Sequence, residues 1–292
     1  MKWILPLGLA VLVAGCGGSS SGPAASTTPA ATAARTPAPP ALCDGELPVR
    51  KLGRAQNPAV TELSGLARTR QGTFWTHNDS GDSARVFELG KTGALVREVQ
   101  VTGAEAVDWE DIAIRGRTLY AGDIGDNLGQ RKEIVVYEFA IPEGGTAVAT
   151  RIALTYPDRP HDAEALLVDP RTGQLAIVTK NLGGVADVYT ATKSGPLKKA
   201  ATVELGIGQA ITSGDVSADG RTVVLRSYDS AFVWRKTRKE SLATAFKRDR
   251  ECTVGADLLD EGQGESIALS RNGRAFYTLP EGANPTLRRY GG

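Results

Sequence analysis

The chain has 292 residues, of which 41% are hydrophobic and 23% charged, so it can bury a core for one or two domains. Its 34 basic and 33 acidic side chains nearly cancel, which leaves no positive surplus for binding nucleic acid. Its two histidines, His77 and His161, are too few for a zinc site built from several histidines. The composition therefore disfavours a nucleic-acid binder and a zinc hydrolase.

The N-terminal residues predict an export signal. Lys2 precedes an apolar run over 4–13 that is too short to span a bilayer comfortably, and small residues follow it. The segment Leu12-Val13-Ala14-Gly15-Cys16 resembles the bacterial lipobox, in which the cysteine becomes the lipidated N-terminus. We expect a signal peptide over 1–15, lipid on Cys16, and a place in the bacterial cell envelope on the extracytoplasmic side of a membrane. An ordinary signal peptide with an incidental cysteine is the alternative.

A linker and two further cysteines follow. Residues 16–42 are rich in Ser, Thr, Ala and Pro, which predicts a flexible tether before a folded body over 43–292. With Cys16 assigned to lipid, Cys43 and Cys252 remain near opposite ends of that body. An oxidising exterior favours a disulfide between them, and two unrelated buried thiols are the alternative.

The body is a repeat with a period of about 50 residues. Each unit has a small or acidic residue followed by apolar residues, then a turn with Gly, Asp or Asn, then a second apolar strand. Four short strands per unit and little helix predict an all-β, five-bladed β-propeller. One short helical turn is expected over 241–248. The in-register residues of the five units are Ser64, Glu110, Glu164, Gly214 and Glu265.

The fifth unit has three strands before it ends at Tyr290. Residues 47–55 can supply the missing fourth strand, so we expect an N-terminal strand to close the ring and leave no blade with an open edge. This assignment places Cys43 beside blade five and Cys252 on the outer strand of blade four, which is compatible with their disulfide. We expect a monomer.

Acidic residues of the repeat predict a metal site. In a propeller the first strand of each blade lines the channel and the second runs back, so first-strand starts and second-strand ends lie on one face. Carboxylates that converge near the axis need a counter-charge, and oxygen ligands from several strands suit Ca²⁺. Alternatively, these acids accept hydrogen bonds from backbone amides and have only a structural role in the repeat. The candidate ligands are Ser64, Glu110, Glu164, Glu265 and Asp215, which stands beside Gly214.

The second-strand ends predict an anion- or substrate-binding region at the same mouth. Lys180 and Arg226 are the cations expected to hold phosphate-like oxygens there. Alternatively, they neutralise nearby acids such as Asp229. The candidate residues are Asn78, Asp79, Asp123, Lys180 and Arg226.

The pattern resembles the calcium-activated nucleotidase (apyrase) family, five-bladed propellers whose first strands supply Ser and Glu ligands to a central Ca²⁺. The family's order of Ser, Glu, Glu, Ser, Glu matches the in-register residues above, except that Gly214 replaces the second Ser and has no hydroxyl. The segments LYAGDIGDN and FWTHNDSG are similar to its second strands and following loops. The phrases over 62–67 and 162–166 also resemble phytase-like secreted bacterial propellers.

These observations predict a lipid-anchored propeller that uses Ca²⁺ and binds an unknown small-molecule or protein ligand at its mouth. The resemblance implies an alternative, a Ca²⁺-dependent hydrolase of phosphoesters or phosphoanhydrides. No catalytic residue can be assigned from the sequence. The binding function is preferred because Gly214 supplies no side-chain ligand atom at its place among the in-register residues.

Overall fold

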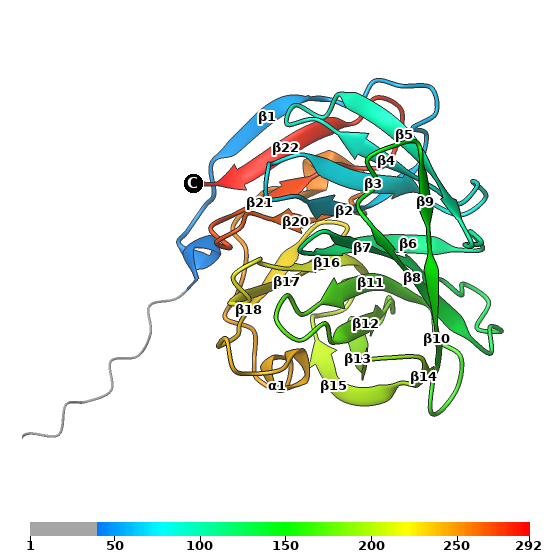
Figure 1. Cartoon of the computed structure of the whole chain (residues 1–292). Helices are drawn as coiled ribbons and strands as arrows, with labels where there is room; N and C mark the ends of the chain where they lie inside the picture. The colour runs from blue at the N-terminus through cyan, green and yellow to red at the C-terminus, as the bar shows by residue number, and fades with distance from the viewer. Residues whose placement is uncertain (1–39) are drawn as a thin grey trace, which may run out of the picture. The chain divides into compact units, whose positions relative to one another are not determined.

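The computed structural model describes residues 40–292, so the predicted signal peptide, Cys16 and most of the linker lie outside it. Five mainly antiparallel sheets follow one another in chain order and surround a common axis as the blades of a propeller (Figure 1). The predicted all-β, five-bladed architecture is confirmed. Within the described range, no helix is long and apolar enough to cross a membrane.

The first four blades each run from an inner first strand to an outer fourth strand. Blade 1 contains β2 (Leu63–Arg68), β3 (Phe74–Asn78), β4 (Arg85–Leu89) and β5 (Leu95–Thr102). Blade 2 contains β6 (Trp109–Arg115), β7 (Thr118–Asp123), β8 (Ile134–Ala140) and β10 (Thr150–Thr155). Blade 3 contains β11 (Ala163–Val168), β12 (Leu175–Thr179), β13 (Val185–Ala191) and β15 (Lys198–Glu204). Blade 4 contains β16 (Ile211–Val216), β17 (Thr222–Ser227), β18 (Ala231–Arg235) and β19 (Cys252–Thr253).

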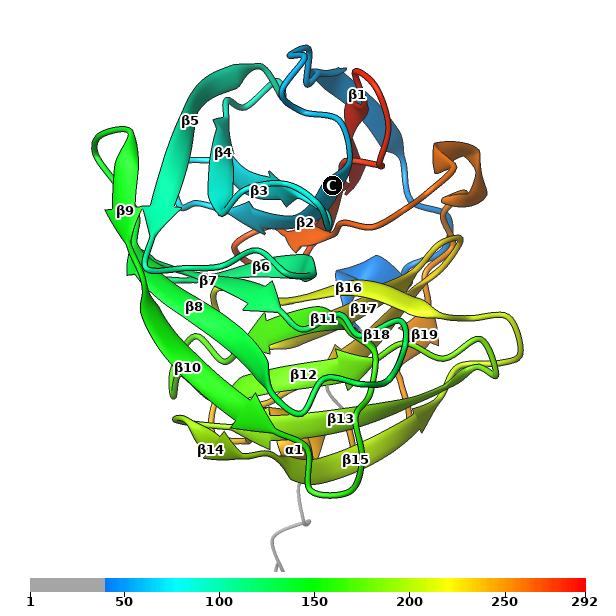
Figure 2. The same ribbon diagram turned by 90° about the vertical axis from the view of Figure 1, so that its right-hand side faces the viewer.

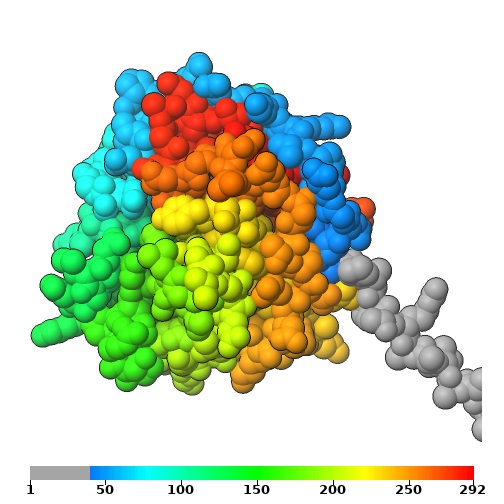
Figure 3. Space-filling view, turned by 180° about the vertical axis from the view of Figure 1, so that it is seen from behind, coloured from blue at the N-terminus to red at the C-terminus, as the bar shows by residue number. Residues whose placement is uncertain are grey.

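Blade 5 is built from both ends of the folded chain. Its outer strand β1 (Val49–Arg54) pairs antiparallel with β22, and Figure 1 shows the two side by side in blue and red. The space-filling view from behind shows blue N-terminal and red C-terminal residues in contact (Figure 3). The predicted closure by an N-terminal strand is therefore confirmed. The remaining strands of blade 5 are β20 (Ala268–Leu269), β21 (Ala275–Thr278) and β22 (Thr286–Gly291).

Two short strands that the sequence pattern did not predict join neighbouring blades. β9 (Thr146–Val148) pairs parallel with β5 of blade 1, and β14 (Gly195–Pro196) pairs parallel with β10 of blade 2 (Figure 2). β9 comes from the chain segment of blade 2 and extends the outer edge of blade 1, and β14 comes from that of blade 3 and extends the outer edge of blade 2. Edges that would otherwise expose unpaired backbone groups are thereby covered.

The core lies between the blades, in five clusters of buried residues, one at each junction of the described ring. Strand side chains alternate between the two faces of a sheet, so a strand buried on both faces serves two junctions. In β12, Leu175 and Ile177 pack against blade 2, whereas Ala176 and Val178 pack against blade 4. This packing fixes the blades face to face and positions the loops at both ends of the axis.

The predicted disulfide between Cys43 and Cys252 is present, with a Cα–Cα distance of 5.8 Å. Cys43 ends a short 3₁₀ turn, η1 (Ala41–Cys43), and Cys252 begins β19. Leu42, beside Cys43, is completely buried in the cluster between blades 4 and 5. The expected helical turn is α1 (Leu242–Ala245), which is capped by the Ser241 hydroxyl. A second 3₁₀ turn, η2 (Leu259–Glu261), precedes β20.

Candidate metal centre

The first strands of blades 2, 3 and 4 each contain a bulge at their second residue. The pairing with the second strand skips Glu110 in β6, Glu164 in β11 and Thr212 in β16. A bulge leaves one residue outside the ladder and redirects its side chain. Thr212 is therefore the counterpart of the two glutamates in blade 4, and the predicted alignment on Gly214 is wrong by two residues.

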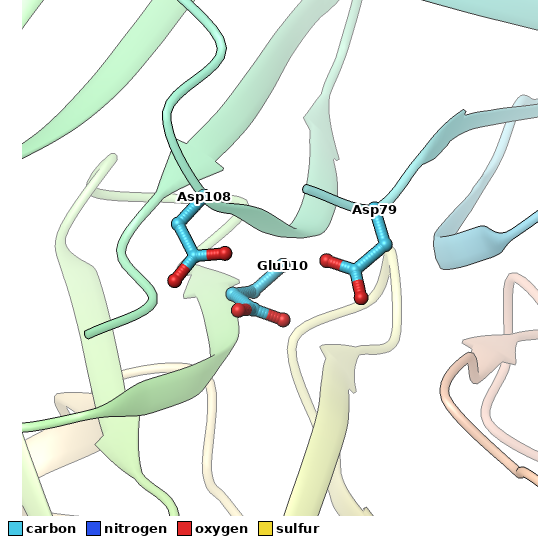
Figure 4. A group of neighbouring side chains, drawn as sticks. All are labelled: Asp79, Asp108 and Glu110. Carbon is cyan, nitrogen blue, oxygen red and sulfur yellow. The ribbon is translucent and has the colours of Figure 1, made fainter. Parts of the chain in front are cut away.

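Carboxylates from blades 1, 2 and 3 converge at the face where the first strands begin. Asp79, Asp108 and Glu110 each offer an oxygen, and these oxygens lie within 4.8 Å of one another. Figure 4 shows these three carboxylates turned toward a shared space. Glu110, Asp162 and Glu164 form a second group by the same criterion. Glu110 belongs to both groups, so the five side chains form one continuous set, which we name the acidic cluster.

Asp108 and Asp162 were not among the predicted site residues. Each lies two residues before a bulged glutamate, in the segments Asp108-Trp109-Glu110 and Asp162-Ala163-Glu164. This repeated Asp-x-Glu spacing was the signal that could have identified them. Asp79 reaches the cluster from the end of β3, where its amide donates to the Glu62 carbonyl at 2.7 Å.

The loop after β7 shapes one side of the acidic cluster. The amides of Ile124 and Gly125 donate to the Asp108 carbonyl at 3.1 and 3.2 Å. A Cβ at Gly125 would lie 2.1 Å from Glu110 Oε1 and 2.5 Å from Asp108 Oδ2. Such contacts are closer than atoms tolerate, so glycine is what allows this backbone to approach the carboxylates.

Burial and neighbouring carboxylates raise the pKa values of Asp108, Glu110 and Glu164 in the acidic cluster. Burial, then the charges of Asp79 and Asp162, raises the pKa of Asp108 to about 6. Burial is also the main cause of the strongly raised pKa of Glu110, and the charge of Glu164 adds to it. Burial raises the pKa of Glu164 as well, although the Lys180 ammonium opposes this rise. A bound cation would favour the ionised form of all these carboxyls.

Lys180 provides positive charge at the edge of the acidic cluster. It follows β12, forms an ion pair with Glu164, and lies 5.4 Å from the centre of the Tyr228 ring. Lys180, together with the Arg131 guanidinium that pairs with Asp123, cannot balance the charge of five converging carboxylates. The arrangement therefore retains a need for further positive charge.

Two of the other predicted ligands lie beside the acidic cluster. The Ser64 hydroxyl donates to the Glu110 carbonyl at 2.5 Å and so holds the bulge of β6 against blade 1. Glu265 is 7% exposed, and its Oε2 atom is buried without a hydrogen-bond partner. Burial, then the charge of Glu281, raises the pKa of Glu265 to about 7.

Asp215, the remaining predicted ligand, lies at the opposite end of the axis. It lines a cavity formed where the first strands end. Its carboxylate accepts hydrogen bonds from the amides of Val216 and Leu269, both at 2.7 Å. Asp215 is therefore removed from the candidate ligands, because it is bound to backbone away from the other acids.

Three predicted anion-binding residues are engaged within the fold. Asn78 donates to the Asp82 carboxylate at 2.8 Å, and Asp123 forms an ion pair with Arg131 at 2.9 Å. Arg226 is completely buried.

The buried Arg226 guanidinium pairs with Glu261 at 2.6 Å and donates to the Ser266 carbonyl at 3.1 Å. The prediction that Arg226 faces the mouth is corrected: it neutralises an acid, and that acid is Glu261 rather than Asp229. Lys180 is the predicted cation that the structure brings to the acidic cluster.

A cavity of about 380 Å³ adjoins the acidic cluster. Asp162 and Lys180 belong to its lining and therefore connect it to the carboxylates, and Arg159 and Asn181 line it as well. His161, also in the lining, bonds through Nε2 to the Asp158 carboxylate at 3.0 Å. The site therefore combines carboxylate oxygens with a polar cavity.

Comparison with solved structures finds similar architectures at low identity. A gluconolactonase from Xanthomonas campestris matches over 87% of this chain and 95% of its own, with 12% identity and a TM-score of 0.48. A putative oxidoreductase (glucose dehydrogenase) from Thermus thermophilus matches over 83% and 99%, with 10% identity and a TM-score of 0.47. A chain of a mitotic checkpoint complex matches over 78% of this chain, with 14% identity and a TM-score of 0.40. This chain spans 61% of that one.

No protein-family model and no curated protein matches this sequence. The resemblance to nucleotidase and phytase-like propellers, drawn from sequence motifs, stays a prediction. The structural likenesses are too distant to assign a ligand, a metal or a reaction to this chain.

Proposed function

We propose that this chain is a calcium-dependent binding module of the bacterial cell envelope, a monomer anchored to a membrane through lipid on Cys16. The observation that supports this function is the acidic cluster, in which Glu110 is common to two groups of carboxylates. Ca²⁺ takes six to eight oxygen ligands in flexible geometry, which suits carboxylates from three blades. Asp79, Asp108, Glu110 and Asp162 would hold the ion, and Glu164 would be shared with Lys180.

The environment of the acidic cluster fits a cation. Gly125 leaves the space beside Glu110 free of a side chain, and the buried Glu265 Oε2 has no hydrogen-bond partner. Burial, and then repulsion from Asp79 and Asp162, raises the pKa of Asp108, and a divalent ion would relieve that repulsion. When bound, Ca²⁺ would offer open coordination positions to a carboxylate, phosphate or carbonyl oxygen of a ligand.

The adjoining cavity is the proposed ligand site. Lys180 and Arg159 are cations in its lining, and Asp162 links it to the ion. A ligand with an anionic group could therefore contact the metal and these cations together. The ligand is proposed to be a small molecule or an exposed loop of a protein.

Calorimetric titration of the purified chain with Ca²⁺ tests the metal site. Glu110→Gln removes the carboxylate common to both groups and should weaken binding by about tenfold or more, or about 1.4 kcal/mol. Glu204→Gln, on the exposed outer strand β15, is the matched control and should leave the affinity unchanged. Wild-type protein that takes up no Ca²⁺ at millimolar concentration would remove the proposal.

The second candidate function is a Ca²⁺-dependent hydrolase of phosphoesters or phosphoanhydrides. The observation that favours it is the position of Lys180, which lies in the cavity lining and contacts the acidic cluster. A bound Ca²⁺ would polarise a phosphoryl oxygen, and Lys180 would hold another. Phosphate release from nucleotides, inositol phosphates or simple phosphoesters, dependent on Ca²⁺ and lost in Lys180→Ala, would establish the enzyme. Ligand binding without turnover would leave the binding module.

The anchor has a separate test. Mass spectrometry of the N-terminal peptide, from protein expressed in a bacterium, should show a lipid-modified Cys16. Cys16→Ser should abolish that modification and release the protein from the membrane fraction. Unmodified Cys16 in membrane-associated protein would contradict the anchor and leave the metal site unaffected.

A further inference from the structure

The end of the axis opposite the acidic cluster is rich in arginine. Here each blade has the turn that joins its first strand to its second, and every one of these five turns contains an arginine at its start, within it or at its end. These are Arg68, Arg115, Arg171, Arg221 and Arg271, one from each blade. The fold thus collects positive charge at one end and carboxylates at the other.

A cavity of about 150 Å³ lies within this arginine-rich end. All five blades contribute to its lining, which places it on the axis; Arg68, Ile114, Pro170, Val216 and Leu269 represent blades 1 to 5. Its volume is about ten times what one water molecule needs, so a small oxyanion fits.

Three arginines that line this cavity are available to a ligand. Arg68, Arg70 and Arg271 form no ion pair with any carboxylate of residues 40–292. The Nε atom of Arg68 is buried without a hydrogen-bond partner, and its guanidinium lies 4.9 Å from the centre of the Tyr277 ring. A buried guanidinium donor without an acceptor costs free energy, so Arg68 retains an unused capacity to donate a hydrogen bond.

Asp215 is the carboxylate in the same lining, and one carboxylate cannot offset the charge of three guanidinium groups. Both of its oxygens accept backbone amides, from Val216 and Leu269, so they are directed onto the strands. Burial also raises the pKa of Asp215 to about 7. The cavity therefore keeps an excess of positive charge.

A layer of hydrogen bonds closes the axis between the two ends. The buried Asp111 carboxylate accepts from the amides of Leu166 and Gly214, at 3.0 and 3.2 Å, and from the Ser213 hydroxyl at 3.1 Å. Ser213 Oγ in turn accepts from the Ile267 amide at 3.3 Å. These contacts join blades 2 to 5, so the arginine-lined cavity is separate from the acidic cluster.

We propose that the arginine-lined cavity is a second binding site, which takes a phosphate-class oxyanion independently of Ca²⁺. Guanidinium groups bind phosphate oxygens through paired N–H donors, and three of them around one cavity can contact several oxygens of a tetrahedral anion. The phosphate group belongs to free phosphate or to a lipid headgroup. The site does not depend on the proposed function of the acidic cluster.

Titration of the purified chain with inorganic phosphate, in chelator so that no calcium phosphate forms, tests this site. The double variant Arg68→Gln, Arg271→Gln should lower the phosphate affinity by about tenfold or more, a loss of the order expected for charge-assisted bonds. The matched control, Arg50→Gln with Arg54→Gln, removes the same charge from the exposed edge of β1 and should bind phosphate like wild type. Glu110→Gln should also leave phosphate binding intact, which separates this site from the acidic cluster.

Sedimentation with vesicles that contain phosphatidic acid, against vesicles of phosphatidylcholine alone, distinguishes the two sources. Binding to the acidic vesicles that the arginine variant loses assigns a lipid headgroup, whereas binding of phosphate alone assigns the free anion. If the double variant unfolds, the exposed Arg271→Gln with Arg70→Gln replaces it, and the melting curve verifies folding. Wild-type protein that binds neither phosphate nor acidic vesicles, or folded variants that bind both like wild type, would overturn the proposal.

Discussion

Gly125 approaches the acidic cluster so closely that a methyl group would overlap Glu110 Oε1. We expect Gly125→Ala to weaken Ca²⁺ binding by about tenfold or more, because the new Cβ displaces ligand oxygens from a shared ion. Gly144→Ala is the matched control, since a Cβ there meets no atom within 4 Å. Calcium titration of both variants is the measurement, and equal affinities would contradict the proposed position of the ion.

The Arg226–Glu261 pair contributes to the stability of the fold rather than to the metal site, and both side chains are completely excluded from solvent. Arg226→Ala leaves the buried Glu261 carboxylate paired with Arg288, at 3.3 Å, so it should lower the free energy of unfolding by up to about 3–5 kcal/mol. Arg151→Ala breaks the exposed pair with Glu133 and should cost at most about 1 kcal/mol. Urea unfolding of the two variants makes the comparison, and a small loss for Arg226→Ala would show that the buried pair is not structural.

Residue types alone could not distinguish a cation that reaches the acidic cluster from one that is buried in the core. Lys180 and Arg226 both end second strands in the sequence pattern, yet one reaches the acidic cluster and the other turns into the core. A Cβ at Gly264 would lie 1.9 Å from Arg226 Nη2, so a glycine in the next blade makes the space for that guanidinium. Such a cross-blade contact has no local signature in the sequence.

The blades show why elements were easier to predict than their register. Turn residues and apolar strands recur at a steady period, and this was sufficient to predict five blades and the closing strand β1. The two- and three-residue strands β14 and β9 are too short to show alternation. One bulge moves a residue out of the ladder, so the alignment on Gly214 missed Thr212.

The disulfide holds the shortest outer strand of the ring. β19 has two residues, and Cys252, its first residue, is bonded to Cys43 across a sequence separation of 209. Replacement of both cysteines by alanine should lower the free energy of unfolding by about 2–5 kcal/mol, because the bond restricts the unfolded chain. Denaturant unfolding provides the measurement, and reductant added to wild type should reproduce the loss. Equal stability with and without the bond would contradict this role.

For the molecule as a whole, the metal-free protein should lose stability as the pH rises from about 6.5 to about 8. Burial raises the pKa values of Glu265 and Asp215 to about 7 each, so the folded state keeps protons that the unfolded chain has already released. Their contribution is complete below the ordinary carboxyl range and is lost as the pH rises through about 7. Below about 6.5 the lowered pKa of the buried His77 opposes this trend.

Urea unfolding in chelator across this pH range measures the effect. Saturating Ca²⁺ should reduce the loss, because the ion favours the ionised carboxylates of the acidic cluster. Stability that stays constant or increases from pH 6.5 to 8 in chelator would contradict the electrostatic account of the axis.

The central claim is that the acidic cluster of the propeller holds Ca²⁺. Its most direct test compares the melting temperature of the protein in Ca²⁺ with that in chelator. An ion that binds the folded state at a hundredfold above its Kd stabilises the protein by about 2.7 kcal/mol, which raises the midpoint by roughly 5–10 °C. Wild type should show this shift, Glu204→Gln should match it, and Glu110→Gln, with its tenfold or weaker binding, should shift by about half as much or less. Identical wild-type midpoints in chelator and across micromolar to millimolar Ca²⁺ would contradict the account.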